Sequence, residues 1–87
     1  MRDGIICHVN LFDLHQTIRE IKNDTVKDIG LVQTKDLGTA IGKYCLTNNI
    51  DYVHLYGDNL FAQRVIEDID KATENLYSKN KIEIEVN

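Results

Sequence analysis

The sequence predicts an α/β fold with the element order β-β-β-α-β-α-β, built as a five-stranded mixed sheet with two helices. Apolar residues alternate with a period of two in the segments before residue 34 and after residue 80. Two segments, 34–49 and 59–78, instead carry apolar residues at helical spacing, and a short run of β-forming residues lies between them. Strands joined through helices run parallel by right-handed crossovers, so we predict the sheet order 3-2-1-4-5.

The first predicted strand, residues 5–12, is apolar on much of both faces. One face holds Ile5, Cys7, Val9 and Leu11, and the other holds Ile6, His8, Asn10 and Phe12. This pattern is typical of a central strand that is covered on each side.

The next two segments predict an antiparallel meander with the third strand at an edge. Residues 14–21 are polar with scattered branched side chains, and Asn23-Asp24 is a turn signal. The third strand spans residues 25–33, where Ile29 and Leu31 fall on one face with Thr25 and Lys27.

The segment 34–49 predicts an amphipathic helix with Thr34 as its N-cap and Asn48-Asn49 as its left-handed stop. Its apolar stripe consists of Leu37, Ala40, Ile41, Tyr44 and Cys45. Gly38 and Gly42 lie inside it, where each costs about 1 kcal/mol relative to alanine. We therefore expect them at a close approach to a neighbouring strand or helix.

Residues 50–56 predict the fourth strand, and Asp58 or Asn59 caps the helix that follows. The apolar stripe of this second helix contains Ala62, Val65, Ile66, Ile69 and Leu76. Either Ala72 or Thr73 fills the position between Ile69 and Leu76. In residues 81–87 Ile82, Ile84 and Val86 alternate with Glu83 and Glu85, which predicts a half-exposed strand at an edge.

Composition limits the classes of function. We expect a single domain over residues 1–87, because the chain is shorter than most compact domains. The net charge of −4 and the pI near 5.2 argue against nucleic acid as a partner, and the tyrosines and phenylalanines are not interleaved with Lys or Arg. No apolar run is long enough for a membrane span, and Cys7 and Cys45 are isolated, so we expect a cytoplasmic protein.

The order of elements resembles the core of the ribonuclease H-like fold, over nearly the whole chain. The resemblance is one of topology and implies metal-binding acids on the first strand, in the first helix and at the end of the fourth strand. Those positions hold His8 or Asn10, then Asp36 in the first helical turn, and then Asp58. Only one of three acids matches, so we expect no metal-dependent cleavage of DNA or RNA.

A ligand site is the alternative interpretation of the loop after the fourth strand. Ligands of open α/β sheets gather at the carboxyl ends of parallel strands. The candidate binding residues are Asn10, His54, Gly57, Asp58 and Asn59. His8 and His54 lie on strands predicted to be neighbours, so their imidazoles are expected to form a cross-strand pair. We predict no metal site, no cofactor and no catalytic residue. The His and Cys residues show none of the sequence spacings that are typical of zinc ligands.

Three functions remain open at this point. The preferred one is a small acidic, non-enzymatic module for protein interaction or assembly, of a kind common among phage and mobile-element genes. The others are a divergent nuclease or nucleotide-handling enzyme, and a small-ligand or anion-binding domain. For the first, we predict a protein partner or a homo-oligomer that contacts the edge strand near Lys81, Glu83 and Glu85, or the exposed helix face.

Overall fold

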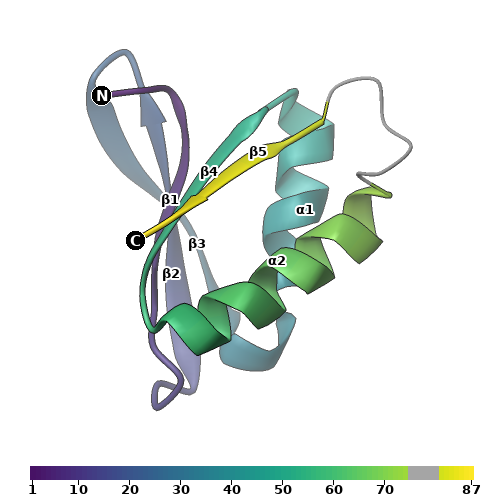
Figure 1. Ribbon diagram of the computed structural model, residues 1–87. Helices are drawn as coiled ribbons and strands as arrows, with labels where there is room; N and C mark the ends of the chain where they lie inside the picture. The colour runs from purple at the N-terminus through teal and green to yellow at the C-terminus, as the bar shows by residue number, and fades with distance from the viewer. Residues whose placement is uncertain (75–80) are drawn as a thin grey trace.

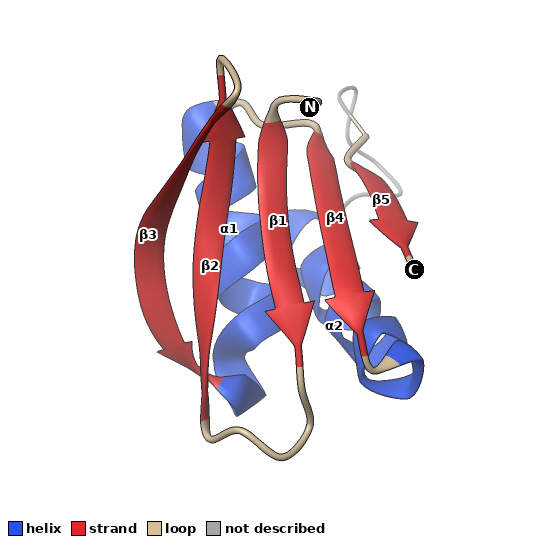
Figure 2. Ribbon diagram, turned by 90° about the vertical axis from the view of Figure 1, so that its left-hand side faces the viewer, coloured by secondary structure: helices blue, strands red, loops and turns tan. Residues whose placement is uncertain are grey.

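The computed structural model describes residues 1–74 and 81–87 and contains the predicted five-stranded sheet in the order β3-β2-β1-β4-β5. The strands are β1 (Gly4–Val9), β2 (His15–Lys22), β3 (Thr25–Gln33), β4 (Tyr52–Gly57) and β5 (Glu83–Val86). β1 pairs antiparallel with β2 and parallel with β4, and β5 runs parallel to β4 (Figure 2). Fold class, element order and sheet order are confirmed.

Both helices lie on the same face of the sheet (Figure 1). They are α1 (Leu37–Asn48), which follows a short 3₁₀ turn at Thr34–Asp36, and α2 (Asn59–Thr73). The crossovers from β3 to β4 and from β4 to β5 step across the sheet in the same direction. Right-handed crossovers of the same direction place their helices on one face, so two layers result.

The core fills the space between the sheet and the two helices. Ile5, Cys7 and Val9 of β1 contribute to it, whereas Ile6 and His8 point to the opposite face, which no described element covers. The expectation that the first strand is covered on each side is therefore wrong. β1 owes its central position to pairing with β2 and β4, and one layer of helices suffices to bury one face.

β1 also ends earlier than predicted, at Val9. The side-chain oxygen of Asn10 accepts a hydrogen bond from the backbone N–H of Phe12 at 3.0 Å, and the Asn10 carbonyl accepts one from Asp13 at 3.3 Å. These bonds turn the chain, so Leu11 and Phe12 belong to a loop and not to a strand.

A β-bulge changes the faces of β3. Ile18 pairs with Gly30 and Arg19 with Asp28, so Ile29 is an extra residue in the ladder. Ile29 and Val32 pack against the core, while Leu31 is 67% exposed. The prediction that Ile29 and Leu31 share a face is wrong, because a bulge reverses the alternation after it.

The helix stops and one cap agree with the sequence. Asn49 adopts the left-handed conformation after α1, and the Asp58 side chain accepts a hydrogen bond from Phe61 N–H at 2.9 Å. Thr34 is not the N-cap of α1, which is Asp36, and the Thr34 hydroxyl instead donates to the carbonyl of Asp13.

The second helix ends at Thr73, since Glu74 takes the left-handed conformation at its C-cap. The predicted extension to residue 78, with Leu76 in the stripe and a turn at 79–80, lies outside the described residues except at position 74. No helix among residues 1–74 and 81–87 is long and apolar enough to cross a membrane.

Candidate functional site

The carboxyl ends of β1 and β4 lie side by side, and four of the five candidate binding residues gather there. Val9 and Gly57 are direct partners in the parallel ladder, so Asn10 and Asp58 follow at the same edge, with Asn59 beginning α2. His54 lies three residues earlier, on the uncovered face of the sheet, where its Nε2 atom contacts Asn87 Oδ1 at 2.6 Å. It does not join the other four.

The polar groups at this sheet edge form hydrogen bonds with one another. Gly57 has a φ of +117°, and Asp58 N–H donates to the Val9 carbonyl at 3.0 Å. The Asp58 carboxylate caps α2, and the Asn10 side chain closes its own turn. The residues that the sequence offers as ligand-binding groups therefore shape the loop at the sheet edge.

We expect Asp58→Ala to lower the free energy of unfolding by about 1 kcal/mol, because Phe61 N–H loses its acceptor at the start of α2. Asp58→Asn, which keeps a side-chain acceptor, should lose much less. Urea unfolding followed by circular dichroism measures both variants. If Asp58→Ala left stability unchanged but abolished a cleavage activity in Mg²⁺ or Mn²⁺, the nuclease alternative would replace the capping role.

The predicted pair of imidazoles is separated by a tyrosine. His8 is in register with Tyr56, and their ring centroids are 5.0 Å apart. Tyr56 also contacts His54, at 6.0 Å between centroids. The two histidines are linked through Tyr56 on the uncovered face. Among the described residues no group of three or more His, Cys, Asp or Glu side chains is placed to hold a metal ion.

Glu83 and Glu85, predicted as interface residues, are engaged within the chain. Glu83 forms an ion pair with Arg2 at 2.5 Å, and Arg2 lies 4.0 Å over the ring of Tyr52. The Tyr52 hydroxyl donates a hydrogen bond to Glu85, which raises the pKa of the tyrosine. These contacts tie β5 to β4 and to the N-terminal segment. Lys81 is exposed just before β5.

The backbone edge of β5 remains as the sequence predicts. Glu83 N–H and Asn87 N–H donate to carbonyls of residues 51 and 55 on the β4 side. Alternate residues of a strand point their N–H groups to opposite sides, so those of Ile84 and Val86 point away from β4. This edge can accept a further strand, and it stays a predicted contact surface.

The cysteines are core residues and not reactive groups. Burial raises the pKa of Cys7 to about 11, an effect that Arg19 opposes. Burial, with Asp51 and Glu20, also raises the pKa of Cys45 to about 11. A thiol with a raised pKa stabilises the fold fully below its ordinary value of 9.0, and this contribution is lost as the pH rises toward 11.

We expect both thiols of the folded protein to react with a disulfide reagent at pH 8 at least about 100-fold more slowly than in the unfolded chain, because the thiolate is the reacting species. Release of the coloured thiol from the reagent measures the rate. The same protein in concentrated denaturant is the control. Equal rates in the two states would contradict the burial of these cysteines.

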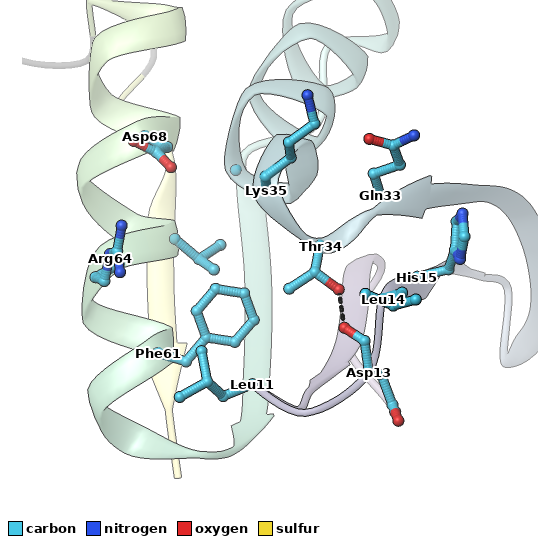
Figure 3. Close-up of a pocket in the computed structure, with 12 residues that line it drawn as sticks. Leu11, Asp13, Leu14, His15, Gln33, Thr34, Lys35, Phe61, Arg64 and Asp68 are labelled. Atoms are coloured by element: carbon cyan, nitrogen blue, oxygen red, sulfur yellow. Dashed lines mark hydrogen bonds between the residues drawn. The ribbon is translucent and has the colours of Figure 1, made fainter.

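A groove that sequence reasoning did not find lies beside this sheet edge, between the loop 10–14, the start of α1 and the first turns of α2. It encloses about 550 Å³ (Figure 3). Its apolar lining includes Leu11, Leu14, Phe61 and Val65, and its charged lining includes Lys35, Arg64 and Asp68. The side chain of Asp13 points away from the groove (Figure 3).

Exposed apolar side chains surround this groove. Phe12 is 90% exposed, Leu60 83% and Leu14 81%, and Leu11 is 53% exposed. The sequence does contain a signal for them, since Leu11-Phe12 and Leu14 are apolar residues flanked by the turn formers Asn10 and Asp13. Apolar side chains in a turn cannot all be buried, so such a segment is a candidate contact surface.

Buried hydrogen bonds hold the loop that carries these side chains. The Gln16 side chain is only 3% exposed, and its Nε2 atom donates to the Asn10 carbonyl at 2.7 Å and to Thr34 Oγ1 at 3.1 Å. Thr34 in turn donates to the carbonyl of Asp13. The loop is thereby tied at both ends to β2 and to the 3₁₀ turn.

No protein-family model matches the chain, and no curated protein matches it significantly in sequence.

Proposed function

We propose that the protein is a non-enzymatic interaction or assembly module whose contact surface is the apolar end of the sheet formed by loop 10–14, the groove and the first turn of α2. We call this surface the loop–groove surface. The observation that carries the proposal is a set of exposed apolar side chains on a loop that the buried Gln16 fixes in place. Exposed apolar clusters of this kind mark interaction sites.

A fixed loop suits binding for a thermodynamic reason. Ordering a loop on association costs conformational entropy, and a loop already held by Gln16 and Thr34 avoids much of that cost. Burying Phe12 and Leu14 in a partner would then stabilise the complex by about 1.5–3 kcal/mol per side chain. A small domain also gains stability from such a partner.

The strand order supports, as a further proposal, kinship with ribonuclease H-like cores. Catalysis of that kind receives no support from the candidate acid positions, because Asn10 closes a turn and Asp58 caps a helix. We therefore propose that the protein has this topology and uses it for binding and not for catalysis.

We expect Leu14→Ser to weaken association with the partner by at least about 10-fold, because this side chain is 81% exposed and lines the groove. The protein is purified from its native host with a tag, and native mass spectrometry gives the stoichiometry of the particle. Leu46→Ser is the matched control, since Leu46 is 52% exposed on α1 and does not line the groove.

Ile84→Pro distinguishes the loop–groove surface from the β5 edge. It removes an N–H that points away from β4, so it should spare the sheet and disturb only a partner strand. Ile84 also packs against the core, so the variant is compared only where circular dichroism shows a folded protein. A particle with the mass of one chain and no stoichiometric partner would refute the proposal.

A further inference from the structure

The loop–groove surface contains both a projection and a recess. The projection is Phe12, which is 90% exposed and is followed in the chain by Asp13, also an exposed residue. The recess is the groove, whose apolar lining includes Leu11, Leu14, Phe61 and Val65, with Leu11 beside Phe61 in Figure 3. Phe12 itself does not line the groove. Projection and recess therefore lie next to each other on one surface.

The charges around the recess complement those of the projection. Lys35 and Arg64 lie on opposite sides of the groove in Figure 3. Three ion pairs are found among the described residues, and neither cation belongs to any of them. Asp68 lies one helical turn after Arg64 on α2 and also lines the groove. The Asp13 carboxylate points outward and forms no ion pair among those same residues.

We infer that the occupant of the groove is a second copy of this chain. In this arrangement Phe12 of each protomer enters the groove of the other, and each Asp13 pairs with Arg64 of the partner. A contact that one surface makes with itself is isologous, so a two-fold axis forms it twice and closes the dimer. The groove of about 550 Å³ has room for a phenylalanine side chain.

The alternative occupants fit less well. A basic partner would leave Lys35 and Arg64 without an acid, and a purely apolar one would leave them unpaired at the rim of the contact. The protein's own loop supplies an aromatic side chain and a carboxylate in sequence, at Phe12 and Asp13. Arg64, with its planar guanidinium, is suited to a bidentate pair with that carboxylate.

This inference rests on the proposed function, and its test uses the purified protein alone. Sedimentation equilibrium should show a dimer, and Phe12→Ser should weaken dimerisation by at least about 100-fold because the contact is lost twice. Leu46→Ser, at an exposed leucine away from the groove, should leave the dimer intact. Phe12 is exposed in the chain, so its replacement should not change the thermal midpoint of the isolated protomer.

A mixing experiment tests the charge pair. Asp13→Arg and Arg64→Asp each place like charges together in both contacts of a homodimer, so each variant alone should be mostly monomeric. Mixed together, they restore one swapped pair and one natural pair, so native mass spectrometry should show the heterodimer in excess over either homodimer. A double variant carrying both changes should dimerise like the natural protein.

The outcomes separate the inference from the proposed function. A dimer that survives Phe12→Ser, or a mixture without preference for the heterodimer, overturns the inference, and loss of that dimer in Ile84→Pro assigns the contact to β5. A purified protein that stays monomeric also overturns it. In that case the interaction module still holds if Leu14→Ser removes a stoichiometric partner of a different chain, and fails with the inference if no such partner exists.

Discussion

Replacing Gly38 with alanine is expected to destabilise the protein by about 2–4 kcal/mol, although alanine is the better helix former by about 1 kcal/mol. A Cβ atom at this position would lie 2.4 Å from the Cβ of Asp68 and 2.7 Å from the carbonyl oxygen of Val65. Both contacts are to atoms fixed to the backbone of α2, so the two helices would have to move apart. Urea unfolding with linear extrapolation measures the loss.

Two further glycines give a graded control for this prediction. A Cβ at Gly42 would lie 3.0 Å from the Cβ of Ala72, so Gly42→Ala should destabilise less than Gly38→Ala. At Gly30 nothing lies within 4 Å, so Gly30→Ala should change stability by no more than about 0.5 kcal/mol. Equal effects at all three positions would show that glycine flexibility, and not helix contact, determines the result.

Gly57→Ala is expected to cost about 2–3 kcal/mol, at the position where the fourth strand turns into α2. Gly57 has a φ of +117°, and a Cβ there would lie 2.4 Å from the carbonyl oxygen of Val9. That oxygen accepts the Asp58 N–H, so the clash would also disturb the start of α2. The same unfolding measurement applies.

The control for Gly57→Ala is Asn59→Ala, at an exposed residue of the same loop and helix start. It should change stability by no more than about 0.5 kcal/mol. A stable Gly57→Ala protein would mean that this loop adopts another conformation in solution, and the geometry of the sheet edge would then need revision.

The sequence predicts the position of the candidate site but only part of its hydrogen bonding. The sequence predicts that Asn10, Gly57 and Asp58 meet at the carboxyl ends of neighbouring strands, and the structure places them there. It predicts that Asp58 or Asn59 caps the following helix, and the structure assigns the cap to Asp58, but it does not reveal the turn closed by Asn10 or the left-handed φ of Gly57. Hydrogen bonding within the loop decides this, and a polar residue in sequence looks the same whether or not its groups are already satisfied.

The loop–groove surface was not predicted because its parts are distant in the chain. Gln16 reaches Thr34 across 18 positions, and the groove joins Leu14 to Phe61. An apolar residue that is exposed at an interface and one that is buried in a core look the same in the sequence. Leu11 and Phe12 were therefore predicted to continue the first strand. Only the position of α2 over the loop shows which of them is covered.

The sequence by itself determined the elements of this protein, their order in the chain and in the sheet, and the faces of the two helices. These depend on local periods and on helix start and stop signals such as Asp58 and Asn49, which are readable along the chain, and on the general right-handedness of crossovers. Tertiary structure alone decided the bulge at Ile29, the uncovered face of the sheet and the loop–groove surface. The sequence predicted a close approach at Gly38, and the structure identifies α2 as the neighbour. Each of these depends on contacts between segments far apart in sequence, where register and packing, and not local pattern, set the free energy.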